Sequence, residues 1–239
     1  MPVRSAPRPL AVLLAALLLV LLWDVSGLDL PLARLAGGPA GFALRDDPRF
    51  VRLFHEVPRL ASWACMAGLF VAIGWPFGML RRLSMAERAQ LALTALASVI
   101  VVSLVKNTSH TSCPWDLREF GGTARHVSHW AWGVLDGGPG RCFPAGHASA
   151  AFAYVGGWFA WRRASPRTGV WWLAAALAAG CVLGLAQQWR GAHYMSHTLW
   201  SAWLCAAVGA CGDALVQARW PRRSGAGHAG RAAAKMNES

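Results

Sequence analysis

The chain has 239 residues, of which 55% are hydrophobic and only 14% are charged. An ordinary globular protein carries about 25% charged residues, so this chain has too few charges to cover a water-exposed surface. The same composition excludes a disordered chain. A net charge of +12 would suit a nucleic-acid partner, but long uncharged stretches of Leu, Ala and Trp argue against one. We therefore expect an integral membrane protein with no nucleic-acid partner.

Six uncharged stretches are the predicted membrane-spanning helices, and together they predict an all-α, polytopic fold. Because the hydrocarbon core is about 30 Å thick and a helix rises about 1.5 Å per residue, roughly 20 residues cross it. Most of the stretches reach that length, and the third is at its lower limit. In chain order they are Pro9–Trp23, Leu60–Leu80, Ala89–Val105, Cys142–Trp161, Thr168–Trp189 and Gly191–Gly212.

The first stretch has two interpretations. It is short and follows Arg4 and Arg8, which is typical of the hydrophobic region of a signal peptide, and a weak cleavage site lies at residues 25–27. Alternatively, it is a retained helix that continues toward Leu28, and we favour this interpretation. Since no internal repeat or low-complexity segment is evident, residues 1–239 are expected to form a single integral membrane domain.

The placement of Lys and Arg predicts which side of the membrane each segment faces. With the N-terminus in the cytoplasm, the cytoplasmic segments carry 13 of the 23 basic residues, and the outer loops hold nearly equal numbers of both signs. We expect a multi-pass protein of the inner (cytoplasmic) membrane, with both termini inside and residues 219–239 as a flexible basic tail. The cytoplasmic segments are 1–8, 79–88, 162–167 and the tail after Leu215, and the outer loops are 24–59 and 106–141.

Three polar clusters lie at the outer ends of predicted spans. The first runs from Lys106 to Asp116, and the second covers residues 143–147, where a turn presents backbone N–H groups and His147 at a helix N-terminus, a natural anion site. The third contains His193 and His197, which share one face if that segment is helical. Polar groups near membrane depth are costly and tend to be functional, so we expect a site at the outer face.

The order and spacing of these clusters resemble the three motifs of the membrane-bound type 2 phosphatidic acid phosphatase superfamily, in a divergent bacterial branch. The family pattern is Lys-x6-Arg-Pro, then Pro-Ser-Gly-His, then Ser-Arg-x5-His-x3-Asp. The resemblance extends from about residue 60 to residue 215 and implies a bundle of about six transmembrane helices. The matching residues are Lys106 and Pro114 in the first motif, Pro144, Gly146 and His147 in the second, and His193 in the third.

Four parts of the pattern differ in this chain. Two phosphate-binding guanidinium groups are missing from their usual positions, and Arg side chains are major contributors to phosphate recognition. Arg190 is the nearest replacement, and Arg118 and Arg141 are further candidates. The differences are Cys113 in place of the first Arg, Ala145 in place of Ser, Ala186-Gln187 in place of Ser-Arg, and His197 in place of Asp.

The resemblance implies a reaction and a role for each residue. His193 would be the nucleophile that takes the phosphoryl group, and His147 the general acid for the leaving alcohol. His197 or Asp116 would orient His193 in place of the family Asp. The implied activity is hydrolysis or transfer of a lipid phosphate monoester or diphosphate at the outer face, through a phosphohistidine and without a metal or other cofactor. The groups that would stabilise the phosphoryl group are Lys106, Arg190 and the backbone N–H of Gly146.

Other interpretations stay open. The protein could be a catalytically silent homologue that binds anionic lipid heads. It could also hold a metal-dependent site, because His-x3-His is a familiar zinc spacing on a helix; the ligands would be His193, His197, His147 and Asp116. Lys106 could be a snorkelling residue at a helix end. The histidines of the Gly-rich outer loop, which are His110, His126 and His129, are expected to be solvated.

Cysteine placement adds one expectation. Cys113 and Cys142 are both predicted to lie outside, each one or two residues from a motif proline. In an oxidising periplasm they could form a disulfide, which would close a loop of about 30 residues and contribute roughly 3 kcal/mol or more. That bond would hold the first two clusters together. The alternative is two free thiols.

Overall fold

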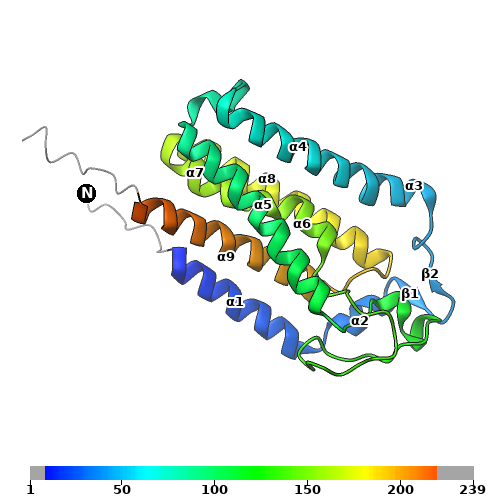
Figure 1. Cartoon of the computed structure of the whole chain (residues 1–239). Helices are drawn as coiled ribbons and strands as arrows, with labels where there is room; N and C mark the ends of the chain where they lie inside the picture. The colour runs from blue at the N-terminus through cyan, green and yellow to red at the C-terminus, as the bar shows by residue number, and fades with distance from the viewer. Residues whose placement is uncertain (1–8, 220–239) are drawn as a thin grey trace, which may run out of the picture.

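The structure is a computed structural model that describes residues 9–219 and is mainly helical, which confirms the all-α fold. Five of its segments are long and apolar enough to cross a membrane. Figure 1 shows them in one bundle, with α1 and α4 on opposite sides and α5, α8 and α9 between them. The segments are α1 (Pro9–Ser26), the run Pro48–Arg82 that contains α4 (Val57–Gly74), α5 (Met85–Thr108), α8 (Pro166–Trp189) and α9 (Met195–Arg219).

The fourth predicted span, Cys142–Trp161, is helical only from Gly146 onward. It forms α6 (Gly146–Phe152), a 3-10 turn at Ala153–Gly156 and α7 (Gly157–Ala164), and these pieces pack against α5, α8 and α9. The indole N–H of Trp172 donates to the carbonyl of Tyr154 at 2.7 Å, which gives that carbonyl a partner outside its own helix. The interrupted segment therefore forms the sixth member of the bundle.

The sixth predicted span, Gly191–Gly212, also begins later than expected. Gly191 has a φ of +74°, and a Cβ there would lie 2.3 Å from the ring of Phe42, so only glycine fits this turn. The turn ends α8 at Trp189, and α9 starts at Met195. His193 therefore precedes the helix that carries His197, so the condition under which the two would share a helix face is not met.

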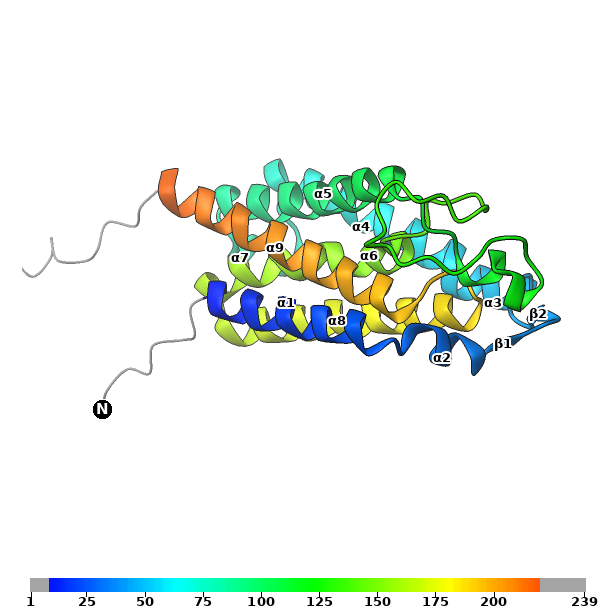
Figure 2. The same ribbon diagram turned by 90° about the horizontal axis from the view of Figure 1, so that it is seen from below.

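Loops and short elements gather at one end of the bundle, which we call the loop end (Figure 2). Here β1 (Gly37–Gly38) and β2 (Gly41–Phe42) form an antiparallel hairpin, with Gly37 opposite Phe42. The remaining short elements are α2 (Asp29–Arg34), α3 (Pro48–Val51), a π-helical turn at Arg52–Glu56 and 3-10 turns at Pro114–Asp116 and Arg118–Phe120. A small apolar core packs α2, the hairpin and the two 3-10 turns together, and it consists of Ala33, Phe42, Leu117, Phe120, Ala124 and Tyr194.

A buried carboxylate holds the opposite end together. Asp213 of α9 is 2% exposed and accepts hydrogen bonds from Arg162 and Arg163 of α7, from Gln90 of α5 and from Gln217. Because a buried charge is costly unless it is paired, this cluster ties α5, α7 and α9 into one arrangement. The predicted tail, residues 219–239, lies outside the described residues apart from Arg219.

Candidate active site

The three polar clusters of the sequence meet at the loop end. Backbone hydrogen bonds join each pair of clusters, where the bond between the first two comes from Cys142, the residue just before the second cluster. Their relative placement is therefore set by the main chain and does not depend on side-chain rotamers. The hydroxyl of Ser201 adds a bond of 2.9 Å to the carbonyl of Ala145. The three backbone bonds run from Cys142 N–H to Thr111 at 2.9 Å, from Trp115 N–H to Gly191 at 3.0 Å and from Ala145 N–H to His197 at 3.1 Å.

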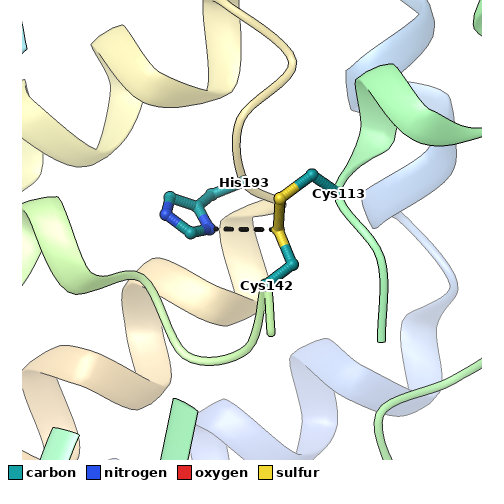
Figure 3. A group of neighbouring side chains, drawn as sticks. All are labelled: Cys113, Cys142 and His193. Atoms are coloured by element: carbon teal, nitrogen blue, oxygen red, sulfur yellow. Dashed lines mark hydrogen bonds between the residues drawn. A yellow bond between two sulfur atoms is a disulfide. The ribbon is translucent and has the colours of Figure 1, made fainter. Parts of the chain in front are cut away.

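A disulfide joins Cys113 and Cys142, the pair expected from the sequence. Figure 3 shows it beside His193, with Sγ of Cys142 lying 3.4 Å from Nδ1 of the imidazole. A disulfide sulfur carries no hydrogen, so a hydrogen bond between the two atoms runs from Nδ1–H to sulfur. We therefore assign His193 the Nδ1–H tautomer, which leaves the lone pair on Nε2.

The two residues expected to orient His193 are placed differently. Asp116 accepts a hydrogen bond from the backbone N–H of Cys113 at 3.2 Å, and burial raises the pKa of its carboxyl. His197 lies with its ring centroid 5.8 Å from that of His193. Within the described residues, neither side chain hydrogen-bonds His193, and the sulfur of Cys142 occupies that position instead.

His193 is held as a neutral imidazole. Its side chain is fully buried, and burial lowers its pKa well below the ordinary value of a histidine. The positive charge of Lys106 acts in the same direction, while the backbone carbonyl of Cys142 opposes it. Since only the neutral form has a free nitrogen lone pair, this environment favours a nucleophile.

His147 and Lys106 complete the centre of the site. The ring of His147 lies 6.2 Å from that of His193, at the first turn of α6. Lys106 lies in the last turn of α5 with its ammonium against the start of α6, where a Cβ built on Gly146 would lie 3.5 Å from Nζ. Among residues 9–219 this ammonium has no hydrogen bond or ion pair, so it is available to an anion.

Of the arginines considered, only Arg190 is part of this cluster. It is 7% exposed and donates hydrogen bonds to the carbonyl of Arg45 and to Gln187, with Trp115 beside its guanidinium. Its charge acts on both His147 and His55. Arg118 is exposed and donates to the carbonyl of Thr123, and Arg141 is also exposed.

Sequence reasoning missed two residues of the α3–α4 run. His55 packs against His147 with ring centroids 4.0 Å apart, and its Nδ1 is buried with no hydrogen-bond partner among the described residues. Arg59 is close enough for its charge to act on both rings. The sequence did contain one indication of these two residues. His55 and Arg59 are four residues apart, just before a predicted span, and this spacing places both on one helix face.

The residues considered as metal ligands from the sequence do not form a ligand set in the described part of the chain. In the described part of the chain, one trio of candidate ligand atoms lies within 4.8 Å of one another, and it consists of Cys113, Cys142 and His193. Two of its members are joined as a disulfide, so they offer no thiolate. The four residues considered from the sequence, His193, His197, His147 and Asp116, do not form such a group.

The histidines of the outer loop are not all solvated. His110 and His126 are exposed, as expected. The side chain of His129 is only 9% exposed, because its ring stacks on Phe143 with centroids 4.1 Å apart and planes 7° from parallel. The expectation for His129 is therefore wrong.

Comparison with known proteins identifies the family. Residues 88–221 match the PAP2 superfamily, and the chain therefore belongs to it, as its motifs indicate. The match begins later than the residue 60 expected from the sequence, so α1 and α4 lie outside it. No curated protein and no solved structure matches the chain at a significant level.

Proposed function

We propose that this protein is a membrane phosphatase or phosphotransferase that acts on a lipid phosphate monoester or diphosphate. Membership of the PAP2 superfamily suggests activity on phosphate monoesters. One observation carries the proposal: two imidazoles, those of His193 and His147, lie 6.2 Å apart at the loop end beside the unpaired ammonium of Lys106. This arrangement supplies a nucleophile, an acid and a cation for one phosphoryl group.

The reaction divides into two steps. In the first, Nε2 of neutral His193 forms a bond to phosphorus as the ester P–O bond breaks, and His147 gives its proton to the departing oxygen. In the second, a water or acceptor hydroxyl attacks phosphorus, the P–N bond breaks, and His147 takes the proton from the attacking oxygen. The phosphoryl group thus passes through a phosphohistidine, and both imidazoles return to their starting states.

Positive charge around the site supports this reaction. The charges of Lys106 from α5, Arg190 from the α8–α9 turn and Arg59 from α4 all act on His147. A phosphate dianion offsets these charges and so favours the protonated form of His147 that the first step requires. Fixed cations of this kind stabilise the charge on a transferring phosphoryl group.

An apolar groove next to the site supports a lipid substrate. A hollow of about 330 Å³ lies between α4, α6 and α8, and it begins at Pro58, Ala150 and Ala151, one helical turn from His147. A second hollow of about 460 Å³ adjoins it along α4, and the two share Cys65, Tyr154 and Trp172. A lipid tail in this groove would leave its phosphate at His147.

We place the loop end outside and the opposite end in the cytoplasm. The opposite end carries Arg81, Arg82, Arg162, Arg163, Arg167 and Arg219, whereas the loop end mixes both signs, which follows the positive-inside rule. The site would then face the periplasm of an inner-membrane protein. A disulfide at the loop end agrees with an oxidising compartment.

The proposal is tested by phosphate release from a panel of phospholipid and polyprenyl phosphates, with the purified protein in detergent. We expect activity in wild type and a loss of about 1,000-fold or more in His193→Ala and His147→Ala. A phosphohistidine trapped by acid-free quench should be present in His147→Ala and absent from His193→Ala. His110→Ala, at an exposed loop-end histidine, is the matched control and should keep wild-type rates.

Unchanged activity in both histidine variants would end the proposal. If wild type releases no phosphate from any lipid but still binds anionic lipid vesicles, the silent-homologue interpretation is correct instead.

A further inference from the structure

The ring of His147, the general acid of the proposed reaction, has no hydrogen bond to any of residues 9–219, and its Nδ1 is buried without a partner. Its nearest ring neighbour among these residues is His55, with centroids 4.0 Å apart and planes 39° from parallel. The ring of His193 lies farther away, at 6.2 Å. A general acid must hold its proton toward the leaving oxygen, so the orientation of His147 depends on its packing against His55.

His55 lies in a special turn of the backbone. Residues Arg52–Glu56 form a π-helical turn between α3 and α4, a feature that is frequent at functional sites. Pro58 follows two residues after the turn. Because proline has no N–H, the carbonyl of Phe54, four residues earlier, lacks an α-helical donor. That carbonyl is therefore free to bind a group from another helix.

Gln187 of α8 supplies that group and fixes the turn. Its Nε2 donates to the carbonyl of Phe54 at 3.0 Å, and its Oε1 accepts from the guanidinium of Arg190 at 3.0 Å. The side chain is fully buried, so the loss of either bond would leave a costly unpaired group. Gln187 stands where the third family motif has its arginine. The residue that replaces a phosphate-binding arginine thus holds the turn that carries His55.

The charges around the two rings limit the pair to one proton. Two imidazolium rings in contact would repel each other. A phosphate dianion next to His147 favours the proton there, which leaves His55 neutral, and an aromatic face next to a cation stabilises its charge. His193 faces His147 as a neutral ring. The positive groups that act on both rings are Arg59, Lys106 and Arg190, and Glu56 acts on His55 in the opposite direction.

We propose that His55 is the positioning residue of the general acid, which holds the ring of His147 by stacking and stabilises its protonated form. His55 touches no substrate and exchanges no proton, and Gln187 supports it through the π-helical turn. This inference rests on the proposed function. It adds to the site a residue that lies outside the family match at residues 88–221.

Steady-state kinetics of the full chain in detergent tests whether His55 acts through His147. We expect His55→Ala to lower kcat on a lipid phosphate by about 10–100-fold with little change in KM, because the acid is misplaced. His55→Phe keeps a ring and should recover most of the rate. His55→Ala/His147→Ala should be no slower than His147→Ala, because no acid remains to be positioned. Leu53→Ala, at an exposed residue of the same turn, is the matched control.

A change of leaving group distinguishes an effect on the acid from a general loss of structure. Nitrophenyl phosphate releases a stable phenolate that needs no proton, whereas a lipid phosphate releases an alkoxide that does. His55→Ala and His147→Ala should therefore both lose much less activity on the aryl ester than on the lipid. On the lipid, the alkaline limb of the kcat profile should move to lower pH by about half a unit in His55→Ala and stay in place in His55→Phe.

Histidine NMR gives a readout that needs no turnover. The ring C–H signals of His147, assigned by their absence in His147→Ala, should lie upfield in wild type, because the ring of His55 faces them. They should return toward ordinary positions in His55→Ala and stay upfield in His55→Phe. If wild type hydrolyses no phosphate ester, the proposed function fails, while these spectra still decide whether the two rings are in contact.

Two results would overturn the role of His55. One is a double variant that is slower than His147→Ala by the full factor found for His55→Ala alone. The other is an unchanged His147 spectrum in His55→Ala. If His55→Ala melts below wild type, His55→Gln removes the ring with a smaller loss of volume, and the same comparisons apply to it.

Discussion

Cys142 places a disulfide sulfur 3.4 Å from Nδ1 of His193, at the position where the family motif leads one to expect an acidic partner. A neutral sulfur is a weaker acceptor than a carboxylate, so it orients the imidazole without adding negative charge. The nucleophile therefore relies on burial and on the fixed tautomer for its reactivity.

Removal of the disulfide should affect both stability and turnover. For Cys113→Ser/Cys142→Ser, we expect the free energy of unfolding to fall by about 3–4 kcal/mol, because the bond closes a loop of 29 residues. We also expect kcat to fall more than KM rises, since His193 loses its orienting contact. Thermal denaturation and steady-state kinetics measure the two effects.

A free cysteine on α8 provides the control for that variant. Cys181→Ser should match wild type in both measurements, because Cys181 is exposed, unpaired and outside the apolar groove. Labelling of Cys113 or Cys142 by a thiol reagent without prior reduction would contradict the disulfide itself.

Loss of the Lys106 ammonium should reduce catalysis with little effect on folding. Lys106→Met is expected to lower kcat/KM by about 10²–10³-fold, the usual cost of one group that stabilises transition-state charge. Lys106→Arg should recover part of the rate, because it keeps the charge. Arg118→Met is the matched control, since Arg118 is exposed and donates only to a loop carbonyl. Equal loss in Lys106→Met and Arg118→Met would mean a general electrostatic effect.

Stability should decrease in acid, partly because of His193. Its pKa in the folded protein is lowered by burial, whereas an unfolded histidine has a pKa of about 6.5, so below that pH the unfolded chain binds the extra proton. The contribution of His193 to the free energy of unfolding is therefore fully present above pH 6.5 and decreases as the pH falls below that value. His193→Gln should reduce this dependence by up to about 1.4 kcal/mol per pH unit.

Thermal denaturation between pH 5 and 8, with EDTA present, measures that slope. His110→Gln should leave the slope unchanged, because His110 is exposed. A His193→Gln slope as steep as that of wild type would show that protonation of other groups causes the acid loss.

Neutralising Asp213 should destabilise the end of the bundle opposite the site. Asp213→Asn leaves Arg162 and Arg163 without their shared carboxylate, and the expected cost is about 3–5 kcal/mol. Asp46→Asn is the control, since the Asp46 side chain is 91% exposed. A melting temperature of Asp213→Asn within one degree of that of Asp46→Asn would be inconsistent with the cluster.

Many features of the fold could be predicted from the sequence, because hydropathy and the spacing of polar residues depend only on neighbouring residues in the chain. The membrane class, most span boundaries within a few residues and the three clusters follow from uncharged runs and from polar residues at their ends. The resemblance of the three clusters to the family motifs points to Lys106, His147 and His193, and the structure brings them together.

The features that could not be predicted depend on contacts between segments that are distant in the sequence. The turn at Gly191 has no hydropathy signature, so His193 was assigned to a helix that starts only at Met195. The packing of His55 against His147 and of His129 against Phe143 joins residues far apart in sequence. Single-sequence periodicity contains no information about such pairs.

Helix α1 is exposed along most of its length, with Val20 as its buried residue, yet two of its residues form hydrogen bonds with α9. Asp24 accepts from Trp200, and the carbonyl of Leu13 accepts from Trp203. Because α1 is synthesised well before α9, it must wait in the bilayer until α9 is inserted. Translation has to pass Trp200 before the loop end of α1 has its partner, so a nascent chain arrested earlier is expected to lack this contact.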